Sequence, residues 1–115
     1  MFAFPKTARL LLRKEFREVL DHGIKIADHN LVMVARPASE TTARLGIIVS
    51  KKVGGAVVRN RIKRLLRERY RASRASLGAI NLVIIARHKV AETPSEELFG
   101  SYDRCVSRLV RKLEA

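Results

Sequence analysis

The sequence predicts an α+β fold in which three helices pack on a small four-stranded sheet. Two kinds of segment support this prediction. Short apolar runs rich in β-branched residues indicate strands, and three longer segments carry apolar residues at helical spacing. Their order along the chain is helix, three strands, helix, strand, helix. Because we see no linker and no internal repeat, we expect a single domain over residues 1–115.

The first helix is expected over residues 14–22. Phe16, Val19 and Leu20 fall on one face of this helix, which would pack on the core. Gly23 follows directly, at a position where many helices end in a residue with positive φ.

Four strands are expected from short apolar runs at residues 24–27, 31–36, 44–50 and 80–87. The second run alternates in side-chain direction, and the fourth is continuously apolar, which is typical of an interior strand. An extended or turn-rich arm at residues 1–13 and a polar turn at residues 37–43 are expected outside these segments.

The second helix is expected over residues 56–73. Its apolar side chains recur at the spacing of one helical face: Val58, Ile62, Leu65, Leu66 and Tyr70. At about 100° per residue, polar and basic side chains gather on the opposite face: Asn60, Lys63, Arg64, Arg67 and Arg71. This helix would therefore bury one face and present a basic one.

The last helix has a recognisable start. Thr93 as N-cap, Pro94 at the first helical position and Glu96 two residues later predict a capping box. An apolar stripe follows at helical spacing: Leu98, Tyr102, Cys105, Val106, Leu109 and Leu113.

Basic residues are concentrated around the second helix. The chain has 24 Lys and Arg against 11 Asp and Glu, a net charge of +13. Residues 51–74 hold ten basic residues and one acid, Glu68, so ion pairs within the helix cannot neutralise them. A soluble domain this basic usually binds nucleic acid, since guanidinium groups match phosphate oxygens. A solvated basic face and an anionic membrane surface are the weaker alternatives.

Two glycines precede the basic helix. Gly54 and Gly55 would let backbone N–H groups approach a phosphate at the helix N-terminus. The spacing is not that of a nucleotide-binding P-loop. A strained turn that only positions the helix explains the two glycines equally well.

A second candidate surface is an apolar groove beside the basic helix. Phe16, with Leu20 one turn later and the strand around residues 32–34, could hold single-stranded RNA by stacking. The alternative is that these are ordinary core residues. We favour that alternative for Val32 and Leu20, and weigh the two equally for Phe16.

Catalytic constellations are missing from the sequence. The three aspartates are scattered, the three histidines form no ligand cluster, and no zinc pattern occurs, so we expect neither catalytic residues nor a bound metal. Cys105 lies on an apolar stripe and is expected to be a buried hydrophobe. One cysteine, short apolar runs and no secretory signal together favour the cytoplasm.

The run over residues 44–71 resembles the protein subunit of bacterial ribonuclease P. The family signature is a Val-Ser-Lys-Lys-x-Gly turn followed by Ala-Val-x-Arg-Asn-Arg-x-Lys-Arg, and both parts stand at residues 49–54 and 56–64. Phe4–Pro5, Glu15–Phe16 and the run at residues 82–87 agree with the flanks of the family pattern. The resemblance covers nearly the whole chain.

This resemblance implies an α-β-β-β-α-β-α fold with a left-handed βαβ crossover. It also implies a partner: a catalytic RNA that uses Mg²⁺, held mainly by the RNA, to cut the 5′ leader from precursor tRNA. One protein and one RNA would form the holoenzyme. The family's RNA contacts fall here on Lys52, Arg59, Asn60, Arg61, Lys63, Arg64, Arg67 and Arg71.

The leader cleft of the family lies between the first helix and the sheet. It maps here onto Phe16, Leu20, Val32, Val34, Ser50 and Lys51. Many members carry an aromatic residue in place of Leu20 and a tyrosine in place of Val34. The cleft of this chain would therefore offer less stacking surface, and leader binding would depend more on Ser50, Lys51 and nearby basic residues.

Three alternatives stay open. A stand-alone nuclease is opposed by the missing acid pairs. A ribosomal or general RNA-binding protein of similar fold would bind a different RNA. A reader of double-stranded DNA is least favoured, because the sequence has no dimerisation seam or second reading element.

Overall fold

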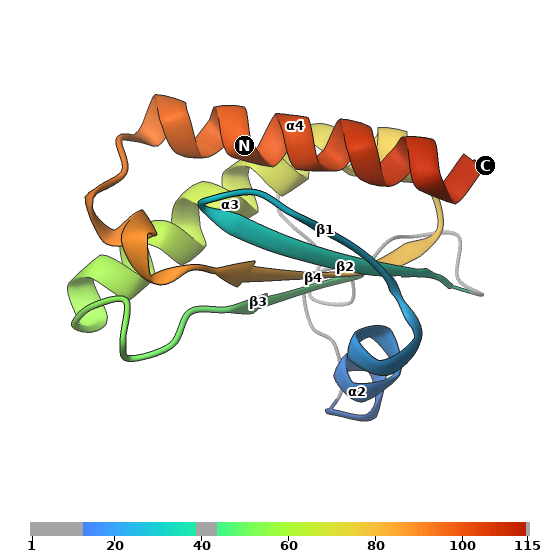
Figure 1. The fold of residues 1–115 in the computed structure, drawn as a ribbon, viewed down its shortest axis with the longest axis horizontal. Helices are drawn as coiled ribbons and strands as arrows, with labels where there is room; N and C mark the ends of the chain where they lie inside the picture. Colours follow the sequence, from blue (N-terminus) through green and yellow to red (C-terminus); the bar gives the residue numbers. More distant parts are fainter. Residues whose placement is uncertain (1–12, 39–43, 115) are drawn as a thin grey trace.

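The computed structural model describes residues 13–38 and 44–114, shown in Figure 1. The predicted arm at residues 1–13 therefore lies, apart from Arg13, outside the described residues, as does most of the predicted turn at residues 37–43.

The elements follow the predicted order: α2 (Arg13–His22), β1 (Ile24–Ala27), β2 (Leu31–Pro37), β3 (Arg44–Ile48), α3 (Ala56–Leu77), β4 (Ile80–Ala86), η1 (His88–Glu92) and α4 (Ser95–Glu114). The helix α3 runs to Leu77 rather than Ser73 and stops at Gly78, whose φ of 72° suits glycine. The short 3₁₀ helix η1 was not predicted.

The sheet has the strand order β1-β2-β4-β3. The β1–β2 and β2–β4 pairs are antiparallel, while β3 and β4 run parallel. The connection from β3 through α3 to β4 is left-handed, as the resemblance implied, against the strong right-handed default. The register places Ala27, Val32, Ile85 and Ile48 in one row across all four strands.

The helices cover the two faces of the sheet unequally. α3 and α4 lie on one face and α2 on the other (Figure 1). The larger core fills the α3–α4 side, where the predicted stripe residues Ile62, Leu66 and Tyr102 are fully buried. A smaller core under α2 contains Val19 and Val34. Among the described residues, α2 is the one helix on this face of the sheet, and it leaves part of the face uncovered by helix.

Gly23 is required for a reason other than the one predicted. Its φ is not positive; among the described residues Gly78 alone has a positive φ. A Cβ at Gly23 would instead lie 2.5 Å from the Val19 carbonyl oxygen and 2.7 Å from Val34 Cγ1. Glycine is needed here because α2 and β2 approach closely.

The predicted capping box is not formed. α4 begins at Ser95, and the Thr93 hydroxyl lies 3.3 Å from Asn30 Oδ1 and 3.4 Å from the Lys89 carbonyl oxygen. The Asn30 side-chain amide also donates to Ser101 Oγ at 2.8 Å. Thr93 therefore takes part in a buried network between the β1–β2 turn and α4.

Candidate nucleic-acid interface

The predicted basic face of α3 is on the surface. Asn60, Arg64, Arg67 and Arg71 are exposed, as are Lys51 and Lys52 in the preceding turn. Arg59, Arg61 and Lys63 are half-buried along the flanks of the helix. The opposite stripe faces the core, so the amphipathic division of α3 is confirmed.

Two arginines of α3 contact the neighbouring segment instead of only solvent. Arg61 Nη2 donates to Ser95 Oγ at 3.2 Å, at the start of α4. Arg69 pairs with Asp103 of α4 and lies over the Phe99 ring, 5.4 Å from its centroid. Arg69 thus helps to join α3 to α4, which its position in a basic run did not reveal.

The glycine turn before α3 is unstrained. Gly55 is the N-cap with φ −71°, and no side chain caps the helix. A Cβ on Gly55 would meet no atom within 4 Å, whereas one on Gly54 would lie 3.1 Å from Val58. Neither glycine has a positive φ, so left-handed backbone does not explain them, and a turn that positions the helix stays a prediction. Gly55, Lys51 and Lys52 are all exposed, and no side chain caps the backbone N–H groups of the first turn of α3.

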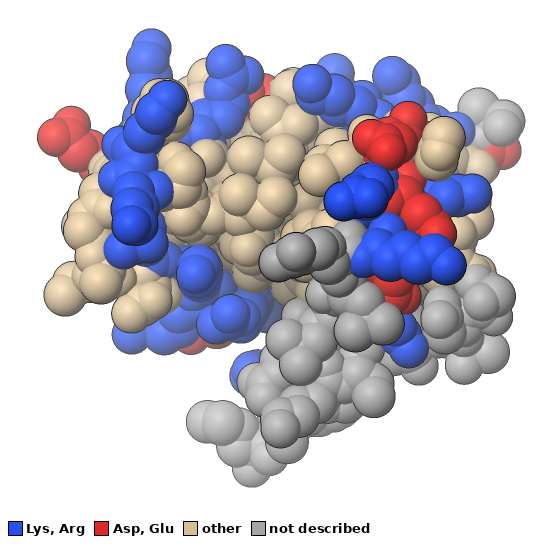
Figure 2. All heavy atoms as spheres, turned by 90° about the horizontal axis from the view of Figure 1, so that it is seen from below, with Lys and Arg blue, Asp and Glu red and all other residues tan. Residues whose placement is uncertain are grey.

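An apolar strip lies on the α2 face of the sheet. Val32, Ile85 and Ile48 are half-buried cross-strand neighbours, and Phe16 of α2 packs beside them. Figure 2 shows this face as an uncharged area bordered by Lys and Arg. We call the strip formed by these four residues the apolar groove.

The other predicted groove residues differ in exposure. Val34 is 4% exposed and packs with Val19 under α2, on the same face of the sheet as Val32, so it is a buried neighbour of the groove. Leu20 is 43% exposed, so the interpretation of Leu20 as a core residue is wrong. Ser50 lies after β3 at the end of the groove, and Lys51 follows it in the chain and is exposed.

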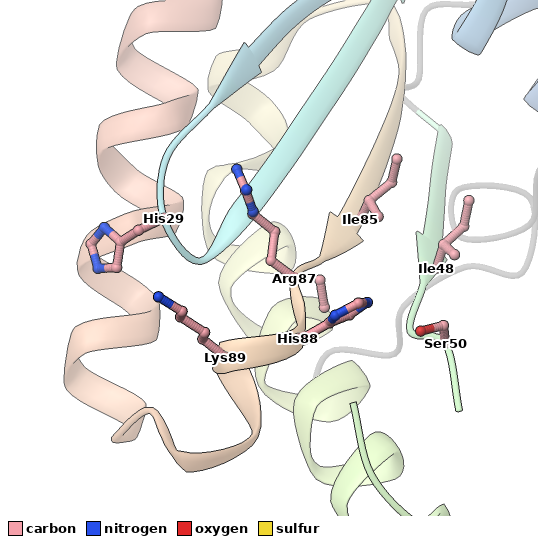
Figure 3. A pocket seen from close by; sticks show the side chains of 8 residues that line it. His29, Ile48, Ser50, Ile85, Arg87, His88 and Lys89 are labelled. Atoms are coloured by element: carbon pink, nitrogen blue, oxygen red, sulfur yellow. The ribbon is translucent and has the colours of Figure 1, made fainter. Parts of the chain in front are cut away.

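A hollow of about 470 Å³ opens at that end of the groove. Its floor includes Ile48 and Ile85, and its rim includes Ser50 and the segment Arg87, His88 and Lys89 after β4 (Figure 3). Sequence reasoning missed these three basic or ionisable residues. The signal was a basic triplet directly after an interior strand, but only the parallel pairing of β3 with β4 places it beside Ser50.

Two ion pairs hold α2 over the sheet. Glu15 accepts a hydrogen bond from Arg44 Nη1 of β3 at 2.8 Å, and Glu18 lies 3.8 Å from Arg36 Nη1 of β2. These contacts sit at the end of the groove opposite the hollow. They hold the part of α2 that contains Phe16 against β2 and β3 at that end.

The buried titratable groups show no sign of chemistry. Burial raises the pKa of the Cys105 thiol to about 11 and that of Tyr70 to about 12. A thiol so shifted is a poor nucleophile at neutral pH. Within residues 13–38 and 44–114, no group of three His, Cys, Asp or Glu side chains could hold a metal ion.

The family model for ribonuclease P matches residues 4–110. This chain belongs to the ribonuclease P protein family. The ribonuclease P protein component of Desulforapulum autotrophicum is 41% identical over 96% of this chain and 95% of its own length. That of Petrotoga mobilis is 36% identical over 97% and 96%.

Solved ribonuclease P proteins share the fold. The structure of the Staphylococcus aureus RNase P protein matches with a TM-score of 0.84 and 28% identity, over 89% of this chain and 94% of that one. The Thermotoga maritima RNase P protein matches with a TM-score of 0.79 and 27% identity, over 87% and 96%.

Membership in the ribonuclease P family gives this protein a general role. It is a protein component of the tRNA-processing enzyme ribonuclease P, a ribonucleoprotein endoribonuclease, and the ribonuclease P RNA is its partner. No helix in the described part of the chain is long and apolar enough to cross a membrane.

Proposed function

We propose that this protein binds the catalytic RNA of ribonuclease P through α3 and the 5′ leader of precursor tRNA through the apolar groove. The RNA contacts are the turn and helix residues Lys52, Arg59, Asn60, Arg61, Lys63, Arg64, Arg67 and Arg71. The leader contacts are Phe16, Leu20, Val32, Ser50 and Lys51, with Val34 as a buried neighbour. Arg87, His88 and Lys89 extend the leader site.

The arrangement of the two surfaces carries this proposal. The basic helix lies on one face of the sheet and the apolar groove on the other. They meet where the chain passes from β3 into α3, at Ser50, Lys51 and Lys52, all exposed. A single protein can therefore contact two RNA segments at once, one on each face.

The groove suits a single strand better than a duplex. Its apolar floor can receive unstacked bases, while Arg87 and Lys89 at the rim, and the exposed Lys51 next to Ser50, can contact phosphates. Phe16 supplies one aromatic surface, and base stacking typically contributes about 1–3 kcal/mol per base. With Leu20 and Val34 in place of aromatic residues, phosphate contacts would carry a larger share of leader affinity, which would make it strongly salt-dependent.

The RNA and the protein have different roles in this proposal because they offer different ligands to a metal ion. In this proposal the RNA carries out catalysis and holds Mg²⁺, which prefers phosphate and water oxygens. The protein supplies positioning and positive charge. Its strongest expected effect is therefore at low Mg²⁺, where the RNA alone is least able to offset repulsion between itself and its substrate.

Reconstitution tests the proposal. A bacterial ribonuclease P RNA would be mixed with a precursor tRNA at low Mg²⁺, with and without this protein. We expect accurate leader removal only when the protein is present. Equal cleavage rates with and without it would contradict the proposal. Co-purification distinguishes a general RNA-binding role, because that role predicts ribosomal RNA instead of one defined RNA.

A second activity is tested in the same experiment. One solved structure that resembles this chain is that of a Staphylococcus aureus RNase P protein mutant with defective mRNA degradation activity. A control arm should therefore contain this protein without any ribonuclease P RNA, with a messenger RNA fragment as substrate. Cleavage in that arm would support an RNA-independent nuclease function for this chain.

A further inference from the structure

A second basic surface lies on α4, away from the basic face of α3. Arg104, Arg108 and Arg111 are all exposed and follow one another at i, i+4 and i+7, so they form one stripe along the helix. Lys112 lies next to it and is also exposed. We call these four residues the α4 stripe.

Ion pairs within the helix do not explain the α4 stripe, although Arg104 Nη2 donates a hydrogen bond to Ser101 Oγ of the same helix at 3.2 Å. Residues 104–113 contain no acid, and Arg104–Arg108 and Arg108–Lys112 are like-charge pairs at i, i+4, which destabilise a helix. The helix dipole favours cations in the last turn, which accounts for Arg111 and Lys112. Arg104 and Arg108 lie further from the end, where that effect has faded.

The α4 stripe is continuous with the hollow at the end of the apolar groove. Asp28 in the β1–β2 turn contacts both the hollow and the stripe. Its backbone carbonyl oxygen accepts a hydrogen bond from Arg87 Nη1 at 3.2 Å. Its side-chain Oδ2 lies 3.6 Å from Arg104 Nη2. Arg87 lines the hollow. Basic groups therefore continue from the hollow, around the β1–β2 turn and onto α4.

The groove itself also leads to this edge. The row of cross-strand neighbours that forms the floor of the groove ends at Ala27 of β1, and Ala27 is exposed. Arg108 Nη1 donates to the Ala27 carbonyl oxygen at 3.1 Å. A strand of RNA that leaves the groove over β1 would pass the exposed Lys25 and Ala27 and then reach the guanidinium group of Arg108.

Asp28 does not cancel the positive charge of this region. Its Oδ1 accepts hydrogen bonds from the backbone N–H groups of Asn30 and Leu31, both at 2.9 Å, and its side chain is only 14% exposed. The carboxylate therefore stabilises the β1–β2 turn. It offsets at most one of the cations around it.

We infer that the α4 stripe binds phosphates of the precursor-tRNA leader that lie beyond the apolar groove. This inference rests on the proposed function of the groove. The occupant is a single RNA strand because the stripe is one arginine wide and follows on from a site shaped for unpaired bases. Leader length would then set how much of the protein the substrate contacts.

The test measures precursor-tRNA binding to the reconstituted holoenzyme with two leaders, of about 4 and about 16 nucleotides, the range of site sizes for single-strand grooves. The main variant is Arg108→Gln with Arg111→Gln. A second, Arg111→Gln with Lys112→Gln, leaves the Arg108 contact to β1 intact. The matched control, Lys14→Gln with Arg17→Gln, removes the same charge from the exposed side of α2.

Selective loss of the long-leader complex supports the inference. We expect affinity for the long leader to fall roughly five- to tenfold and its salt slope to flatten by about 1.4, or about 0.7 per lost phosphate. The short leader and the control should show no change. Equal loss for both leaders would place the stripe against the catalytic RNA and overturn the inference, as would no loss at all. If the unaltered protein improves binding of neither leader, the proposed function fails as well.

Discussion

Arg69 Nε donates a hydrogen bond to Asp103 Oδ1 at 2.9 Å, which links the basic helix α3 to α4 at the surface. The same guanidinium lies over the Phe99 ring. One arginine in the middle of the basic run thus serves the fold, while its neighbours Arg64 and Arg67 have exposed side chains. Charge alone does not separate these roles, but substitutions can.

Arg69→Ala should weaken the fold slightly and leave RNA binding nearly unchanged. It removes an ion pair that is 40% and 50% exposed and a surface cation–π contact, so we expect a loss of about 0.5–1 kcal/mol after solvent screening. Urea unfolding measures the loss. A large fall in RNA affinity with an unchanged unfolding free energy would show that Arg69 contacts RNA instead.

The double substitution Arg64→Ala with Arg67→Ala should weaken RNA binding and leave the stability of the fold nearly unchanged. Both side chains are exposed on the basic face, so stability should change by less than about 0.5 kcal/mol. The slope of log affinity for ribonuclease P RNA against log salt should flatten by roughly 0.7–0.9 for each lost phosphate contact. A salt series on the double variant checks this, and an unchanged slope would exclude phosphate contacts on this face.

Gly23→Ala and Gly55→Ala form a matched pair. At Gly23 the new methyl group would lie 2.5 Å from the Val19 carbonyl oxygen, so we expect a loss of about 1–3 kcal/mol as α2 is displaced. At Gly55 it would meet no protein atom, and the loss should stay below about 1 kcal/mol. Thermal unfolding compares them. Similar melting temperatures would show that α2 can shift without cost.

The stability of the protein should fall at alkaline pH. Burial raises the pKa of Cys105 from near 9 to about 11, so the unfolded state loses the thiol proton first. The contribution of the protonated thiol to the free energy of unfolding is complete below about pH 9 and is lost as the pH rises toward 11. Each unit of difference between the folded and unfolded pKa corresponds to about 1.4 kcal/mol. The raised pKa of Tyr70 acts in the same direction.

Urea unfolding at pH 8 and at about pH 10.5 measures this effect. Cys105→Ala is the control, because it removes the thiol and should reduce the pH dependence while lowering stability at both values. A variant with the same pH dependence as the unaltered protein would assign the effect to other groups.

The main helices and strands could be predicted from local sequence because the apolar residues of each recur at the spacing of a helix or a strand. The strand at Ile24–Ala27 was predicted with both its ends. Four of the five predicted stripe residues of α3 are buried, and the fifth, Val58, is half-buried against the core. The last turn of α3 was missed because its inward residue, Leu77, stands alone among polar neighbours. Only its burial against the core keeps that turn helical.

Features that depend on distant partners could not be predicted in this way. The Thr93 hydroxyl contacts Asn30, which is far away in the sequence, and this tertiary contact replaces the local capping box. Arg87 becomes part of the candidate site only because β3 and β4 pair in parallel. The exposure of Leu20 depends on how α2 packs on the sheet, which its local sequence does not define.

The hydrogen bond from Arg108 to Ala27 has a consequence for self-association. β1 is an edge strand, and unpaired carbonyl groups on an edge invite another chain to add a strand. Arg108 occupies one of those acceptors and places a charge beside it, and Lys25 adds a second charge on the same short strand. A newly made molecule that has not yet met its RNA is thereby protected against edge-to-edge aggregation.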